Sequence, residues 1–174
     1  MRVLFLDFDG VISTNRAYLA QKHIDNRDLR WLDPVACGLI KDLCKEFNLQ
    51  IVVTSTWRKF GLDRVAACLG MHGLWKFTHT DWRTKDLWAK DGTCRPNEIR
   101  DWLARNPECD DWLILDDDEF RWDDEQRRRW VHTHIMDGFS TDNWEQVMNY
   151  FKDWEGAYDS LYPDGTIKNP KKPL

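Results

Sequence analysis

The stretch MRVLFLDFDGVIS, residues 1–13, decides the fold class. Residues 3–6 are consecutive apolar residues of the kind that form a buried strand. The strand ends abruptly in Asp7-Phe8-Asp9-Gly10, which places two carboxylates one residue apart. Packing alone does not explain this arrangement, because burying a charge is costly unless it finds a partner.

Length and composition indicate one compact domain. The chain has 174 residues, of which 42% are hydrophobic and 13% aromatic, enough to bury a substantial core. We expect a single catalytic domain over residues 1–155 and a C-terminal extension over 156–174, ending in a loose Pro/Lys-rich tail. The net charge of -5 offers no general attraction to a phosphate backbone, so any nucleic-acid contact would have to be local.

The cysteines and the hydropathy pattern bear on the cellular compartment. The five cysteines are odd in number and form no CxxC pair, which argues against a disulfide framework or a zinc site. No apolar stretch approaches the length of a membrane span, and the chain enters a strand directly after Met1-Arg2, where a signal peptide would lie. We therefore expect a cytoplasmic protein with no membrane partner and no disulfide partner. The oligomeric state stays open.

Strands alternate with helices along the chain. Apolar runs predict strands at residues 3–6, 51–53, 75–79, 112–115 and 131–136. Helical spacing and capping residues predict helices at 33–47, 62–69, 96–106 and 140–151, while the polar segment 13–30 carries no clear signal. This alternation predicts a three-layer α/β/α, Rossmann-like fold with a mostly parallel sheet and right-handed crossovers.

Three of the predicted strands end in polar residues. Because ligands bind at the carboxyl ends of parallel strands, these polar residues are expected to share one small site. Carboxylates held this close repel one another unless a cation neutralises them, and an all-oxygen set suits Mg²⁺. The candidate members of the site are Asp7, Asp9, Thr54, Ser55, Asp116 and Asp117.

The same residues carry a family resemblance. LDFDGV (6–11) resembles the first motif of the haloacid dehalogenase (HAD) superfamily, and VVTS (52–55) resembles its second. The arginine of CRPNEI (94–99) resembles the Lys/Arg of the third motif, and LILDDD (113–118) resembles the acidic fourth. With their flanking residues, these segments are similar to the HAD domains of RNA-repair proteins, which are related in chemistry to polynucleotide phosphatases. The resemblance covers residues 3–150 and implies a HAD-like fold with no cap or a minimal one.

The resemblance implies roles for the acids. Asp7 would be the nucleophile that forms an aspartyl-phosphate, and Asp9 would be the general acid and then the general base. An aspartate two residues after the nucleophile is found in the phosphatases and phosphomutases of this superfamily. Mg²⁺ would be held by the Asp7 carboxylate, the Asp9 main-chain carbonyl and the fourth motif. We favour Asp117 as the direct ligand and Asp116 as its partner, although Asp118 leaves the register open.

The remaining site residues follow from the other motifs. Thr54 and Ser55 would hydrogen-bond the transferring phosphoryl group. Arg95, at a helix start, would balance the negative charge of Asp7 and of the phosphate; the family more often has lysine at this position. Lys85 and Lys90 are the alternatives to Arg95. Three further residues are substrate-binding candidates: Arg58 as a phosphate clamp, Trp57 as a stacking surface for a base, and Gly10.

Ordinary structural roles compete with these assignments. The aspartates could be turn or cap residues, Thr54 and Ser55 could cap a helix, and each arginine could be an ordinary ion-pair or surface residue. The run Arg127-Arg128-Arg129 is more typical of a solvated face than of a nucleic-acid patch. The pair His132 and His134 lacks a third metal ligand nearby. Among eleven tryptophans, those in polar surroundings are Trp31, Trp57, Trp82 and Trp122.

The sequence predicts a Mg²⁺-dependent phosphatase, a phosphoric monoester hydrolase acting on a nucleotide or a nucleic-acid terminal phosphate. The HAD family resemblance and the small room for a cap favour this substrate class. The sequence leaves open whether the phosphate is on the 3′ or the 5′ end. The alternatives are a HAD phosphatase acting on a small metabolite or a phosphoprotein, and a non-catalytic HAD-fold protein that binds a phosphorylated ligand.

Overall fold

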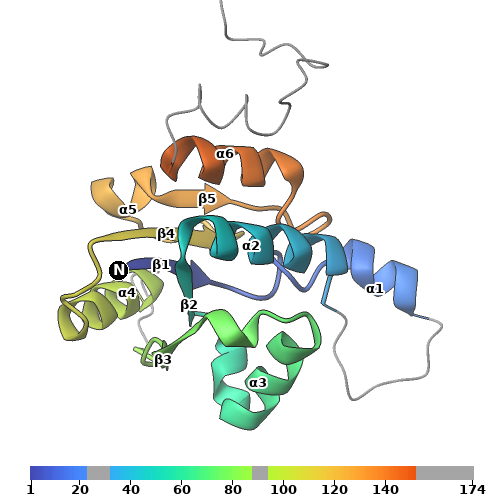
Figure 1. The fold of residues 1–174 in the computed structure, drawn as a ribbon, viewed down its shortest axis with the longest axis horizontal. Helices are drawn as coiled ribbons and strands as arrows, with labels where there is room; N and C mark the ends of the chain where they lie inside the picture. The colour runs from blue at the N-terminus through green and yellow to red at the C-terminus, as the bar shows by residue number, and fades with distance from the viewer. Residues whose placement is uncertain (23–31, 88–93, 152–174) are drawn as a thin grey trace, which may run out of the picture.

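A computed structural model describes residues 1–22, 32–87 and 94–151. Its strands form one five-stranded sheet in the order β3-β2-β1-β4-β5, and every neighbouring pair is parallel (Figure 1). The predicted Rossmann-like parallel sheet is therefore confirmed. The strands are β1 (Arg2–Leu6), β2 (Leu49–Val53), β3 (Thr78–Arg83), β4 (Asp111–Asp116) and β5 (Trp130–His132).

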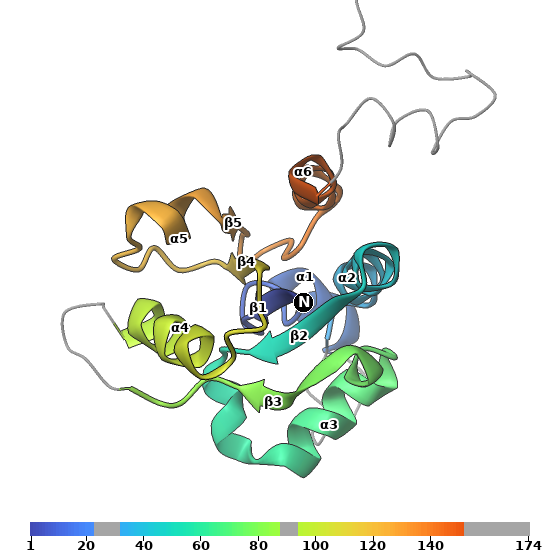
Figure 2. The ribbon, with the colours of Figure 1, turned by 60° about the vertical axis from the view of Figure 1, so that its left-hand side comes forward.

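Helices cover both faces of the sheet, which gives the three-layer arrangement (Figure 2). Helix α4 lies on one face, and α2 and α6 lie on the other. The α-helices are α1 (Asn15–Gln21), α2 (Pro34–Phe47), α3 (Leu62–Met71), α4 (Cys94–Arg105), α5 (Asp124–Arg128) and α6 (Thr141–Phe151), and two short 3₁₀-helices are η1 (Thr56–Phe60) and η2 (Trp75–Phe77).

Helix α2 shows how local sequence fixes an element. The Asp33 carboxylate caps its first turn by accepting hydrogen bonds from the backbone N–H groups of Val35 and Ala36, at 2.9 and 3.2 Å. Pro34 occupies the first helical position, where its missing N–H costs nothing. At the other end, Asn48 adopts the left-handed conformation with φ 53° and ends the helix.

Strand β1 lies in the middle of the sheet and is buried on both faces. Leu4 and Leu6 pack toward α2, α3 and α6, in one core cluster. Val3 and Phe5 pack toward α4, where the Trp102 ring meets the Phe5 ring edge-on at 5.4 Å. A continuous apolar run is what a central parallel strand requires, because helices cover both of its sides.

The structure corrects some predicted boundaries. The strand expected at 131–136 is β5, which ends at His132, because the N–H groups of Asp137 and Gly138 bond back to the His134 carbonyl and turn the chain. The strand expected near 75–79 is β3, which starts later, after η2. Helix α4 begins two residues before Pro96. The short helices α1 and α5 were not expected.

Parts of the predicted organisation lie outside the described residues. These parts are the C-terminal extension over 156–174, Trp31 and Lys90. Within the described ranges, no helix has the length and apolar character needed to cross a membrane.

Candidate active site

The site forms where β1, β2 and β4 end side by side. The sheet register places Leu6 opposite Val53 of β2 and Leu115 of β4. The hydrogen-bond ladder continues one step further, since Asp7 N–H donates to the Leu115 carbonyl at 3.0 Å and Thr54 N–H donates to the Leu6 carbonyl at 2.9 Å. The polar side chains that follow the three strands are thereby brought together.

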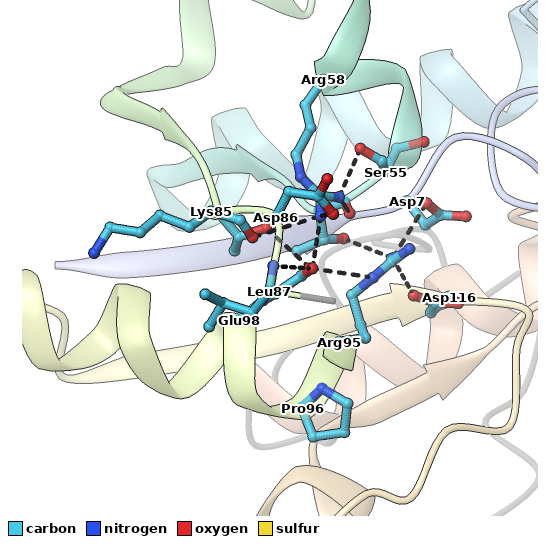
Figure 3. Close-up of polar contacts among 12 residues, drawn as sticks. Asp7, Ser55, Arg58, Lys85, Asp86, Leu87, Arg95, Pro96, Glu98 and Asp116 are labelled. Atoms are coloured by element: carbon cyan, nitrogen blue, oxygen red, sulfur yellow. Dashed lines mark hydrogen bonds and ion pairs between the residues drawn. The ribbon is translucent and has the colours of Figure 1, made fainter. Parts of the chain in front are cut away.

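Arg95 lies at the centre of this group (Figure 3). Its Nη1 lies 3.2 Å from Asp7 Oδ1, 3.2 Å from Thr54 Oγ1 and 2.6 Å from Asp116 Oδ2. Arg95 comes from the first turn of α4 and is 6% exposed, so the alternative of a surface arginine is wrong. Burial alone would lower its pKa, but the charges of Asp116, Asp7 and Glu98 outweigh burial and raise it.

The acids of the site resist simultaneous ionisation. Burial raises the pKa of Asp7, although Arg95 and a hydrogen bond from Ser55 oppose this shift. Burial also raises the pKa of Asp116, with a further contribution from the charge of Asp7. Burial and the neighbouring charges of Asp118, Asp7 and Asp9 raise the pKa of Asp117 to about 6. One arginine does not balance this concentration of carboxylates, which favours an additional cation.

The donor set fits Mg²⁺. Asp7, Asp116 and Asp117 can each offer a carboxylate oxygen, and these oxygens lie within 4.8 Å of one another. Oxygen ligands of this kind are those that Mg²⁺ prefers. Both carboxylate oxygens of Asp116 already have hydrogen-bond partners, because Oδ2 accepts from Arg95 and Oδ1 accepts the Asp118 N–H at 3.0 Å. This difference favours Asp117 as the direct ligand.

Gly10 makes room for Asp117. Its backbone has φ +70°, in the left-handed region, and a Cβ built on it would lie 2.0 Å from Asp117 Cγ. No side chain fits there while Asp117 holds its position. Gly10 thus leaves space for the Asp117 carboxylate, and its contact with substrate stays a prediction.

Asp9 is exposed beside the buried acids, and Trp57 holds it. The Trp57 indole N–H donates to Asp9 Oδ2 at 2.9 Å. The Trp57 ring is only 4% exposed and packs against Phe8 at 5.1 Å. A ring buried to this extent does not offer a face to a base, which corrects the expectation of a stacking surface. Trp57 is instead placed to position Asp9.

Arg58 is a buried ion-pair partner rather than an open phosphate clamp. Its Nη1 donates to the backbone carbonyls of Thr54 and Ser55, and its Nη2 lies 2.7 Å from Glu98 Oε1 (Figure 3). Burial lowers its pKa, against the opposing charge of Glu98. These contacts occupy the two Nη atoms that were expected to bind phosphate. The expected phosphate clamp is therefore wrong, and Arg58 instead supports the backbone of the second motif.

Glu98, which contacts both Arg58 and Arg95, is a site residue that the sequence analysis missed. Its carboxylate pairs with Arg58 and lies 3.8 Å from Arg95 Nε, one turn earlier on α4. The available signal was the three-residue spacing, because residues i and i+3 are neighbours on a helix. Glu98 also accepts the Leu87 N–H at 3.1 Å, which connects α4 to the chain after β3.

Two aromatic side chains of β5 hold the acidic loop. Trp130 Nε1 donates to the Asp116 carbonyl at 2.9 Å, and His132 Nε2 lies 3.0 Å from the Asp117 carbonyl. The two rings pack on each other at 4.5 Å. On the other side, the Arg95 guanidinium lies over the Phe120 ring at 5.1 Å. Aromatic contacts therefore border the fourth motif, and His132 has a backbone partner there.

Of the remaining candidates, Ser55 contacts the acids and Lys85 does not. Ser55 caps η1 by accepting the Trp57 N–H at 3.3 Å, in addition to its hydrogen bond to Asp7. Lys85 is exposed and pairs with Asp101 at 3.2 Å. Three further residues are accounted for by packing or ion pairing: Trp82 packs against Trp75, Trp122 is buried, and Arg129 pairs with Asp111.

Fold and site together define a Rossmann-like α/β protein with an acidic centre at the carboxyl ends of its middle strands. The sequence matches the family described as "HAD domain in Swiss Army Knife RNA repair proteins" over residues 3–144, and the chain belongs to this HAD family. No curated protein and no solved structure matches it significantly. The resemblance drawn from the four motifs is thus confirmed.

Proposed function

We propose that the protein is a Mg²⁺-dependent phosphatase that hydrolyses a phosphate monoester on a nucleotide or a nucleic-acid end through an aspartyl-phosphate. One observation carries the proposal. Asp7 is buried and paired with Arg95, whereas Asp9, two residues later, is exposed and held by an indole N–H. Two carboxylates in such different surroundings are suited to different roles, one as nucleophile and one as proton carrier.

In the first step, a carboxylate oxygen of Asp7 attacks phosphorus and forms an acyl phosphate, while the bond between phosphorus and the leaving oxygen breaks. Arg95 lies against Asp7 Oδ1 and holds the carboxylate in place, while Thr54 Oγ1 shares the same guanidinium nitrogen. Asp9 donates its proton to the leaving oxygen. The Trp57 N–H occupies Asp9 Oδ2, which leaves Oδ1 to carry that proton.

In the second step, Asp9 is ionised and accepts a proton from a water molecule. The water oxygen attacks phosphorus, the bond between phosphorus and Asp7 breaks, and inorganic phosphate leaves. Asp9 is then protonated again and Asp7 is again a free carboxylate, so the cycle is balanced. The exposure of Asp9 gives water access to its proton-carrying oxygen.

Asp7, Asp117 and the Asp9 main-chain carbonyl would hold Mg²⁺, with Asp116 as their partner. When bound, Mg²⁺ supplies positive charge that reduces the repulsion between an anionic nucleophile and an anionic phosphate. The raised pKa values of Asp7, Asp116 and Asp117 support this assignment, because a cation favours their ionised forms.

The substrate class rests on the family. Its description refers to RNA-repair proteins, which favours a phosphate carried by a nucleotide or a nucleic-acid end. The net charge of -5 argues against tight, nonspecific binding of long polynucleotides. A phosphatase for small metabolites or phosphoproteins would use the same residues. A non-catalytic binding protein is less favoured, because both Asp7 and Asp9 are present.

Activity assays test the proposal. The wild-type protein and Asp7→Asn are assayed with and without Mg²⁺ on an aryl phosphate and on a panel of 3′- and 5′-phosphorylated nucleotides and oligonucleotides. We expect phosphate release that requires both Mg²⁺ and Asp7. If both proteins are equally inert across the whole panel, the enzymatic proposal is wrong and the binding-protein alternative is favoured.

A further inference from the structure

A cavity of about 340 Å³ lies beside the acidic site, at the carboxyl end of the edge strand β3. The volume is within the range of small-ligand pockets, at its lower end. Its walls come from η1, from the end of β3 and the residues that follow it, and from the last turn of α4. Five of its lining residues are basic: Arg58, Lys59, Arg83, Lys85 and Arg105.

Carboxylates pair with four of these cations. Glu98 pairs with Arg58, Asp86 with Lys59 at 2.8 Å, Asp101 with Lys85 at 3.2 Å, and Asp81 and Asp101 with Arg105. The pairs of Lys59 and Lys85 are solvent-exposed, and exposed pairs contribute little stability, so an incoming anion can replace the carboxylate at small cost.

Arg83 is the cation in excess. Its Nη1 donates to the Arg58 carbonyl at 3.1 Å, and its guanidinium lies over the neighbouring Trp82 ring at 5.0 Å. Among the described residues it has no carboxylate partner. Its side chain is exposed, and its planar fork matches the geometry of a phosphate group. Five cations thus face four carboxylates, of which Asp81 and Asp86 also line the cavity, so the wall carries one positive charge in excess in a chain whose net charge is -5.

Arg58 contacts both the cavity and the second motif of the acidic site. Arg58 lines the cavity and also donates to the backbone carbonyls of Thr54 and Ser55. In Figure 3, Lys85 and Asp86 lie on one side of the Arg95–Glu98 pair, and Asp7 and Asp116 lie on the other. The buried Arg58–Glu98 and Arg95–Asp7 contacts therefore place the cavity and the acidic site on opposite sides of one polar network.

We propose that this cavity binds an internal phosphodiester of a single-stranded nucleic acid whose terminal phosphate lies at Asp7, with Arg83 as the principal contact. The inference rests on the proposed function for the position of the terminal phosphate. The cavity provides a local binding site for a polyanion in a protein whose net charge is negative. It also favours a nucleic-acid end over a free nucleotide, because a mononucleotide has no internal phosphodiester to place in the cavity.

Binding measurements test the inference independently of turnover. Fluorescence anisotropy in the Asp7→Asn background gives the Kd for terminally phosphorylated tetranucleotides of RNA and DNA, and competition gives the Kd for the mononucleotide. The variant is Arg83→Gln. The matched control is Arg128→Gln, which removes the same charge from an exposed position on α5, outside the cavity.

We expect Arg83→Gln to raise the tetranucleotide Kd about tenfold. It should also reduce the slope of log Kd against log salt by about 0.7, which corresponds to one lost phosphate contact on a single strand. Arg128→Gln and the mononucleotide Kd should show neither change. A loss for RNA, DNA or both supports the cavity and identifies the strand it accepts.

Three results would overturn the inference: unchanged tetranucleotide binding in Arg83→Gln, an equal loss in Arg128→Gln, or an equal loss for the mononucleotide. If the tetranucleotide binds as expected but wild-type protein releases no phosphate from it, the catalytic proposal fails while the cavity assignment stands.

Discussion

Comparing Gly10→Ala with Gly73→Ala distinguishes the effect of displacing Asp117 from the effect of backbone strain. Gly10 and Gly73 share a φ of +70°, so alanine at either position carries the left-handed strain of about 1–2 kcal/mol. Their surroundings differ. A Cβ at Gly10 would lie 2.0 Å from Asp117 Cγ, whereas the nearest atom at Gly73 is Lys41 Cδ at 3.7 Å. Only Gly10→Ala therefore displaces a carboxylate.

Both variants should lose stability, Gly10→Ala at least as much as Gly73→Ala, and they should differ in metal binding. Thermal unfolding in EDTA should show each Tm lowered by about 2–8 °C. Titration calorimetry with Mg²⁺ should show affinity lowered about 10–100-fold in Gly10→Ala, as for loss of a group that orients a ligand, and unchanged in Gly73→Ala. If Gly10→Ala binds Mg²⁺ as tightly as Gly73→Ala, Asp117 is not held as a metal ligand by this contact.

Three further variants test other parts of the site. Asp117 has a pKa of about 6 in the folded protein against 3.8 ordinarily, so the stability of the metal-free protein should fall as pH rises through this interval. Asp117→Asn should then stabilise the metal-free protein at pH 7 by about 1–2 kcal/mol, and stabilisation by added Mg²⁺ should disappear. If metal-free Asp117→Asn is less stable than metal-free wild type, this reasoning is wrong. Glu98→Gln leaves the buried Arg58 guanidinium with the exposed Asp86 carboxylate, 3.5 Å away, as its remaining ion-pair partner among the described residues, and should cost about 3 kcal/mol in chemical denaturation. Asp101→Asn, on the same helix but partly exposed, should cost less than about 1 kcal/mol; equal losses would refute the buried pair. Trp57→Phe removes the N–H that holds Asp9 and should lower kcat about tenfold for an alkyl phosphate but less for an aryl phosphate, whose leaving group needs less protonation; equal effects on both substrates would argue against a role through Asp9.

The sequence predicted the sheet and the membership of the site because both depend on local patterns. Apolar runs marked the strands, Asp33-Pro34 marked a helix start, and the rule that parallel strands end together grouped Asp7, Thr54 and Asp116 before any contact was known. Short elements such as α1 and α5 escaped detection, since one or two turns provide too little periodicity.

Side-chain direction was the part that the sequence could not supply. Arg58 and Trp57 lie in η1 beside the second motif, and spacing alone gave no means to tell that one turns under the backbone to Glu98 while the other turns to Asp9. The function of Gly10 also depends on a tertiary contact, because Asp117 approaches it from the segment that follows β4. Proximity in sequence to a motif therefore predicted involvement but not the kind of contact.

Covalent labelling tests the central claim most directly. Wild-type protein, Asp9→Asn and Asp7→Asn are acid-quenched during turnover of an aryl phosphate with a labelled phosphate, and the label is mapped by peptide analysis. Because an aryl leaving group needs little protonation, Asp9→Asn slows breakdown of the intermediate more than its formation. The proposed mechanism predicts label on Asp7, more of it in Asp9→Asn, and none in Asp7→Asn. Phosphate release accompanied by label on another residue, or by no label in any of the three proteins, would contradict Asp7 as the nucleophile.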